Sequence, residues 1–136
     1  MKTNRSIPHT SVIPVLNYPD VSNAVDWLCA AFGFTLRFQL GTHRAQLNVG
    51  NGCVVAAEDT VPAQAGDHSV MIRVEDADAH CKTARGHGAQ ILSEPEDFPY
   101  GERQYNALDL AGHRWTFTQS LAHLDPRTLG AKVGQL

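Results

Sequence analysis

The stretch "SVIPVLNYPDVSNAVDWLCAAFGF" (residues 11–34) decides the fold, because a strand pattern in it leads directly into a helix pattern. Residues 11–18 are apolar and rich in β-branched side chains, which predicts a strand. Pro14 has no amide hydrogen to donate, so we expect an open or irregular strand edge there. Asp20 is typical of a helix N-cap and Gly33 of the residue after a helix, with apolar side chains at helical spacing between them.

Three more strand patterns follow this helix. They cover residues 35–41, 43–52 and 53–59, and glycine or Asn-Gly turns separate them. A polar connector rich in proline, glycine and alanine then occupies residues 60–67. The first part of the chain therefore has the order strand, helix, strand, strand, strand.

The same order then repeats. The second copy has a strand at 68–76, a helix at 76–90 that ends at Gly86 or Gly88, a short strand at 91–95, and a hairpin of 103–110 with 113–120. Its extra length falls in "EPEDFPYGE" (94–102). One such unit cannot bury the face of its sheet alone. Two units predict an α+β fold in which tandem βαβββ modules form a curved eight-stranded mixed sheet around a cavity.

The expected domain organisation follows from this repeat. We divide the chain into an N-terminal extension (1–9), a first βαβββ module (10–59), a linker (60–67), a second βαβββ module (68–120) and a C-terminal tail (121–136).

Composition narrows the classes of function. The 136 residues are 43% hydrophobic, carry a net charge of −3 and have scattered lysines and arginines, so we expect neither a nucleic-acid nor a membrane partner. No apolar run has the length of a signal peptide or a membrane span, which favours a cytoplasmic protein. The three cysteines are far apart and odd in number, which argues against a disulfide framework.

Two segments resemble a known family. The duplicated pattern, "NYPDVSNAVDWLCAAFGF" (17–34) and "YGERQYNALDLAGHRWTFTQS" (100–120) are similar to the glyoxalase/bleomycin-resistance/extradiol-dioxygenase superfamily, also called vicinal oxygen chelate proteins. The likeness covers roughly residues 10 to 120. Leu110-Ala111 departs from the usual residues of the related branch and changes only a turn.

The resemblance implies a site for a divalent metal, and the residues argue against that metal. Enzymes of the family place ligands, usually His and Glu, on the first and last strands of each half. Alignment of the repeats puts Ile13, Ala56, Ser69 and Thr116 at those positions. Divalent metals of this kind need imidazole or carboxylate donors. We therefore expect no metal and no other cofactor. The seven histidines also lack the i, i+2 or i, i+4 spacing of a metal site.

Strand alternation predicts which side chains face the cavity. If Thr116 faces the cavity, Arg114 and Thr118 do too. In the first strand of each half, the odd-numbered residues at 13–17 and 69–73 face the cavity in the same way. The ligand-binding candidates are Ile13, Asn17, Ala56, Ser69, Met71, Arg73, Arg103, Arg114, Thr116 and Thr118. Such a surface mixes apolar walls with placed polar groups, as ligand pockets do.

Three of these candidates have alternative roles. Arg73 and Arg114 bind an anionic or planar ligand, pair with Glu58 or Glu75, or reach solvent at the open edge of the sheet. Arg103 either contacts ligand or fixes a turn. Glu58 is a weak catalytic candidate, and an ion pair at a strand end is the favoured alternative for it.

Two functions remain open. The first is a metal-free protein that binds or sequesters a small aromatic or amphipathic compound. The second is a glyoxalase- or dioxygenase-type enzyme with a divergent metal site or an acid–base mechanism that uses Glu58, His68 or Arg114. Open strand edges favour a homodimer in either case.

Overall fold

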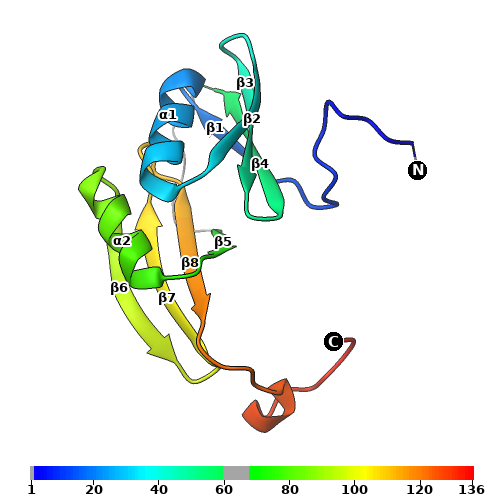
Figure 1. Ribbon diagram of the computed structural model, residues 1–136, viewed down its shortest axis with the longest axis vertical. Helices are drawn as coiled ribbons and strands as arrows, with labels where there is room; N and C mark the ends of the chain where they lie inside the picture. The colour runs from blue at the N-terminus through cyan, green and yellow to red at the C-terminus, as the bar shows by residue number, and fades with distance from the viewer. Residues whose placement is uncertain (1, 60–67) are drawn as a thin grey trace.

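The computed structural model describes residues 2–59 and 68–136, which form two similar halves (Figure 1). The predicted linker at 60–67 lies outside the described residues. The first half comprises β1 (Val15–Tyr18), α1 (Val21–Phe32), β2 (Thr35–Leu40), β3 (Arg44–Val49) and β4 (Gly52–Glu58). The second half comprises β5 (Val70–Arg73), α2 (Ala77–Gly86), β6 (Gln90–Phe98), β7 (Glu102–Leu108) and β8 (Arg114–Ser120), followed by a 3-10 helix at Pro126–Leu129.

Each half contains one mixed four-stranded sheet. The strand orders are β1-β4-β3-β2 and β5-β8-β7-β6. In both sheets the first strand runs parallel to the last, and the remaining neighbours are antiparallel. The predicted α+β class with a repeated βαβββ order is confirmed, with the eight strands divided into two sheets. In the described part of the chain, no helix is long and apolar enough to cross a membrane.

Equivalent caps begin the two helices. Asp20 Oδ1 accepts a hydrogen bond from the Asn23 amide, and Asp76 Oδ1 accepts one from the Ala79 amide, both at 3.0 Å. Gly33 ends α1 in the left-handed conformation, with φ of 77°. Pro14 stands just before β1, and its carbonyl accepts from the Val55 amide at 2.9 Å. The strand predicted from residue 11 therefore begins only at Val15.

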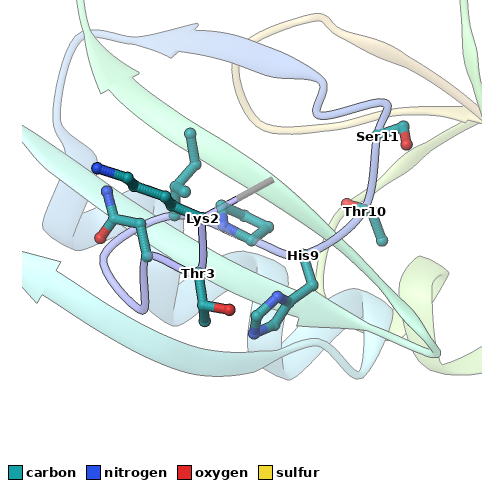
Figure 2. Close-up of a pocket in the computed structure, with 8 residues that line it drawn as sticks. Lys2, Thr3, His9, Thr10 and Ser11 are labelled. Atoms are coloured by element: carbon teal, nitrogen blue, oxygen red, sulfur yellow. The ribbon is translucent and has the colours of Figure 1, made fainter.

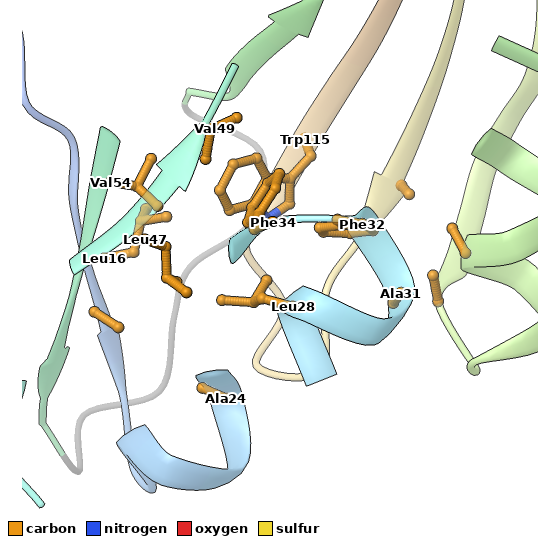
Figure 3. Close-up of a cluster of buried hydrophobic side chains, with 14 of the residues drawn as sticks. Leu16, Ala24, Leu28, Ala31, Phe32, Phe34, Leu47, Val49, Val54 and Trp115 are labelled. Carbon is orange, nitrogen blue, oxygen red and sulfur yellow. The ribbon is translucent and has the colours of Figure 1, made fainter. Parts of the chain in front are cut away.

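One hydrophobic core serves both halves (Figure 3). Phe32, at the end of α1, contacts Phe117 of β8 with ring centroids 4.8 Å apart. Phe34 lies against Trp115 at 5.4 Å, and both aromatic side chains are buried. Because the core crosses from one half to the other, neither sheet is stabilised by its own helix alone.

Hydrogen bonds also join the halves. Their side-chain donors or acceptors are far apart in sequence: Tyr18 to Asp109, His113 to the Asn17 carbonyl, Trp27 to the His87 carbonyl, and His80 to the Phe32 carbonyl. The two helices lie next to each other as a result (Figure 1).

Each sheet therefore has one face that packs into the shared core and one that does not. We call the second face the helix-free face. Buried apolar side chains such as Leu16, Leu47 and Phe117 mark the core face, so their alternate neighbours along each strand lie on the helix-free face.

Candidate functional site

The helix-free face of the second sheet carries several predicted site residues. β5 pairs with β8 so that Met71 lies beside Thr116 and Arg73 beside Thr118. Trp115 and Phe117 point the other way, into the core. Arg114 falls on the same face as the two threonines by strand alternation. Five of the predicted residues therefore share one surface: Met71, Arg73, Arg114, Thr116 and Thr118.

Hydrogen bonds organise this surface into a network that we call the polar ladder. Thr116 Oγ1 donates to Asn106 Oδ1 at 2.5 Å, and Asn106 Nδ2 donates to Ser93 Oγ at 2.8 Å. Thr118 Oγ1 donates to Glu102 Oε1 at 2.7 Å. The members of the ladder are Ser93, Tyr100, Glu102, Gln104, Asn106, Thr116 and Thr118.

The ladder continues to the β6–β7 turn. Gln104 Nε2 donates to Thr118 Oγ1 at 3.1 Å, and Tyr100 Oη donates to Gln104 Oε1 at 2.9 Å. The Tyr100 ring stacks on Phe98 with centroids 5.4 Å apart. Because the side chains fix one another, the surface is ordered before any ligand arrives.

Arg114 stands apart from this network. Its Nε is buried and has no hydrogen-bond partner among the described residues. A buried guanidinium nitrogen without an acceptor is costly, and an incoming acceptor atom would relieve that cost. Arg114 Nε is therefore an unsatisfied donor on this surface.

A cavity of about 380 Å³ lies where the two halves meet. Its walls include Val12 and Cys53 from the first half and Ser69 and Met71 from the second. Burial raises the pKa of the Cys53 thiol, so this side chain is a neutral, weakly polar group. The cavity gives Ser69 and Met71 an apolar neighbourhood beside the polar ladder.

The first sheet differs from the expected register. Val15 pairs with Val55 and Asn17 with Ala57 on the helix-free face, whereas Ala56 pairs with Leu16 in the core. The prediction that Ala56 lies on this surface is therefore wrong. Because side chains alternate along a strand, its neighbours Val55 and Ala57 lie there instead.

The other predicted positions are less central. Asn17 is exposed on the helix-free face, and its carbonyl accepts from His113 Nε2 at 2.7 Å. Ile13 is half-buried and precedes β1. Neither residue joins the polar ladder.

Arg103 lies outside the candidate surface. It follows Glu102 on β7, so its side chain points to the opposite face, where it forms ion pairs with Asp78 of α2 and Asp97 of β6. These two carboxylates raise the pKa of its guanidinium. The alternative of a structural role for Arg103 agrees with these contacts.

Glu58 also lies away from the polar ladder. It ends β4 on the core side of the register and forms an ion pair with exposed His43. The two residues border an open cavity of about 450 Å³ together with Arg44 and Asp59. The favoured alternative from the sequence, an ion pair at a strand end, describes this arrangement.

The residues do not fit the divalent metal that the family resemblance implies. On the helix-free faces, the first and last strands of each half offer Val15, Val55, Met71 and Thr116 near their centres. None has an imidazole or carboxylate donor. Among the residues that the structure describes, no group of three or more His, Cys, Asp or Glu side chains is placed to hold a metal ion.

Sequence reasoning missed the β7 side of the ladder. Glu102, Gln104 and Asn106 alternate with Arg103, Tyr105 and Ala107, so the same two-residue period that identified Thr116 and Thr118 would have identified them.

A further cavity belongs to the N-terminal segment. It measures about 500 Å³, and the described residues that line it all belong to that segment, among them Lys2, Thr3, His9, Thr10 and Ser11 (Figure 2). No residue of either sheet borders it, so it is separate from the polar ladder.

Comparison with known proteins gives a family and a fold. A family model described as "Glyoxalase/Bleomycin resistance protein/Dioxygenase superfamily" matches residues 6–117. No curated protein matches the sequence.

Solved structures resemble the chain over most of its length. The crystal structure of TioX from Micromonospora sp. ML1 is 37% identical, with a TM-score of 0.68, and the match covers 82% of this chain and 99% of that one. A bleomycin-binding protein from bleomycin-producing Streptomyces verticillus, complexed with copper(II)-bleomycin, is 22% identical with a TM-score of 0.63 and coverage of 84% and 98%. A family enzyme from Burkholderia phytofirmans PsJN is 14% identical with a TM-score of 0.70 and coverage of 80% and 97%.

Proposed function

We infer the function from one premise: the chain belongs to the Glyoxalase/Bleomycin resistance protein/Dioxygenase superfamily. Within this superfamily we propose that it is a binding protein, which sequesters a small aromatic or amphipathic compound without a metal ion. A bleomycin-binding protein among the structural neighbours shows that this fold serves ligand binding elsewhere.

The observation that carries the proposal is the buried Nε of Arg114, which lacks an acceptor although the neighbouring Thr116 and Thr118 on the same face are hydrogen-bonded. A carboxylate, carbonyl or phosphate oxygen of a ligand would supply that acceptor. The polar ladder supplies further hydrogen-bonding groups, and the cavity with Met71 and Cys53 supplies apolar contact.

The enzyme alternative has less support. Its acid–base candidate Glu58 is paired with His43 at a strand end, and His68 is exposed just before β5. Arg114 alone cannot perform proton transfer near neutral pH, because a guanidinium stays protonated.

The test is a thermal-shift screen of metabolites, antibiotics and divalent metals on the wild-type chain and on Arg114→Met. A ligand at 100 times its Kd stabilises the native state by about 2.7 kcal/mol. We expect an organic compound to give such a shift and Arg114→Met to abolish it. Without ligand, Arg114→Met should melt at or above the wild-type temperature, because the variant removes an unpaired buried donor.

Arg85→Met is the matched control, since Arg85 lies on α2 and pairs with Glu94 on the opposite side of the second sheet. It should keep the ligand response. The proposal is wrong if metal analysis of protein purified without chelators finds one ion per chain that Glu58→Gln removes.

A further inference from the structure

The helix-free face of the first sheet is already occupied by part of the chain. Residues 4–8, which we call the N-terminal arm, lie across it. Arg37 Nη2 donates to the Arg5 carbonyl at 2.7 Å, and Gln46 Nε2 donates to the Ser6 carbonyl at 2.9 Å. Two neighbouring backbone carbonyls of the arm are thus received by two side chains of the sheet.

The receiving pair is built into the sheet. The register shifts between Leu36 and Phe38, so Arg37 and Phe38 both stand opposite Gln46. Arg37 Nη1 donates to Gln46 Oε1 at 2.6 Å, which fixes the carboxamide with its nitrogen toward the arm. The Arg37 guanidinium also lies 5.2 Å from the centre of the Phe38 ring.

Burial at this contact is greatest at Gln46 and Pro8, whereas Arg37 is half-buried. Gln46 is only 7% exposed although it lies on the helix-free face, and Pro8 of the arm is buried. A buried carboxamide nitrogen requires an acceptor, and the Ser6 carbonyl is that acceptor here. If the arm left, water or the carbonyl of another molecule would take its place.

Few hydrogen bonds join the arm to the sheet. The two bonds from Arg37 and Gln46 join it to the sheet in the described part of the chain, and the residues of the arm other than Pro8 are exposed. Asn4 Oδ1 accepts from both the amide and the hydroxyl of Ser6, so the turn within the arm is held by its own residues rather than by the sheet.

We propose that Arg37 and Gln46 form a binding site for peptide-like compounds, which present two neighbouring amide carbonyls followed by a compact apolar group. The N-terminal arm is the chain's own occupant of this site and competes with such compounds. The proposal rests on the proposed function only in taking the helix-free faces as binding surfaces, and Arg114 has no part in it.

The test uses the full-length chain and a fluorescein-labelled, N-acetylated peptide with the sequence of residues 3–9. Pro8→Asp loosens the arm, because a charge resists burial where proline lay. Fluorescence anisotropy should show that this variant binds the peptide at least roughly tenfold more tightly than wild type, whose tethered arm competes at high effective concentration.

Second-site variants in the Pro8→Asp chain identify the receiving residues. Arg37→Met and Gln46→Leu should abolish peptide binding, whereas Arg44→Met, a matched arginine on the same face, should retain it. Equal peptide binding by wild type and Pro8→Asp, or undiminished binding after Arg37→Met, would overturn the proposal.

Proteolysis tests the same site if Pro8→Asp does not fold. Trypsin cleaves after Arg5, whose carbonyl Arg37 holds, and Lys132 in the exposed tail is an internal reference. Relative to Lys132, cleavage after Arg5 should be faster in Arg37→Met than in wild type or Arg44→Met, and an unchanged ratio contradicts the proposal. Arg114→Met should change neither peptide binding nor the ratio of cleavage after Arg5 to cleavage after Lys132. The experiments therefore test this site separately from the function proposed above.

Discussion

Asp109 connects the two halves through one buried carboxylate. Oδ2 accepts from Tyr18 Oη at 2.6 Å and from Trp115 Nε1 at 3.0 Å, while Oδ1 accepts from the amides of Ala111 and His113. Burial and the nearby Asp109 raise the pKa of Tyr18, so its phenol remains a donor at every ordinary pH. Both oxygens of the carboxylate are thus needed as acceptors.

We therefore expect Asp109→Asn to be strongly destabilising. The amide nitrogen must face a pair of donors, which should cost about 2–4 kcal/mol of unfolding free energy. Tyr18→Phe removes a single bond and leaves Asp109 three donors, so it should cost about 1.5 kcal/mol. Urea denaturation measures both, and an Asp109→Asn variant no less stable than Tyr18→Phe would show that the carboxylate is not the joint between the halves.

At the same scale, alternation along a strand predicted only in part which residues share the helix-free face. It placed Thr116, Thr118 and Arg114 on one face because β8 is regular over Arg114–Ser120. It misplaced Ala56 by one residue and could not orient Arg103, whose partners Asp78 and Asp97 lie on other elements. Hydrogen-bond partners from distant segments, such as those of Asp109, leave no periodic signal in the sequence.

At the scale of elements, the turn between β6 and β7 fixes where the C-terminal tail leaves the second sheet. Gly101 has a φ of 81°, and its carbonyl accepts from the Leu121 amide at 2.8 Å. A Cβ added at Gly101 would lie 3.0 Å from the Ala122 carbonyl oxygen and 3.2 Å from Leu124 Cδ1. The turn and the tail therefore constrain each other.

Gly101→Ala should lower the unfolding free energy by about 2–3 kcal/mol, from backbone strain and the clash with the tail together. Gly112→Ala is the matched control, because Gly112 has a φ of 88° and open space around it. It should cost about 1 kcal/mol from backbone strain alone. Equal losses for the two variants in urea unfolding would mean that the tail does not press on the turn.

The contact between α1 and α2 depends on a neutral histidine. His80 Nε2 lies 2.9 Å from the Phe32 carbonyl and Nδ1 lies 2.5 Å from Tyr105 Oη. The carbonyl can only accept, so Nε2 carries the hydrogen and Nδ1 accepts from the phenol. Burial lowers the pKa of His80, while the bond to Phe32 partly opposes this shift.

The sign of the pH dependence follows from that lowered pKa. Below the unfolded pKa of about 6.5, the unfolded chain takes up a proton that folded His80 resists. The free energy of unfolding therefore decreases as the pH is lowered through this range. Above about 6.5 the contribution is complete. Denaturation between pH 5 and pH 7 should show a flatter dependence for His80→Gln, which keeps a donor and an acceptor, than for wild type. His123→Gln, on the exposed tail, should keep the wild-type slope. If His80→Gln showed the same dependence of unfolding free energy on pH as wild type, the assignment of a neutral His80 would be wrong.

At the scale of the whole molecule, the repeat in the sequence predicted the architecture because both halves carry the same signals. Each has an aspartate cap, a helical apolar stripe and a final hairpin, and both formed the same strand order. The sequence did not predict that the strands divide into two sheets sharing one core. That division depends on contacts such as Phe32 with Phe117, which join positions distant in the chain.

The edge strands of the two sheets suggest that two copies associate. Within residues 2–59 and 68–136, β1 and β5 each pair on one side only, and their helix-free faces expose Val15 and Met71 by 52% and 58%. Unpaired strand edges with exposed apolar side chains are sites of association. A second copy covering them would also enclose the polar ladder and the cavity beside Met71.

We therefore expect the protein to sediment at twice the 14.8 kDa of the chain. Met71→Asp should shift it to the monomer, because a carboxylate cannot be buried unpaired in the contact. Leu40→Asp is the matched control, since Leu40 is 62% exposed but lies on β2 at the opposite edge of the first sheet. It should remain dimeric. A single-chain mass for wild type at micromolar concentration, or dissociation of both variants alike, would mean that β1 and β5 are not the contact, and the ligand surface would then be complete within one chain.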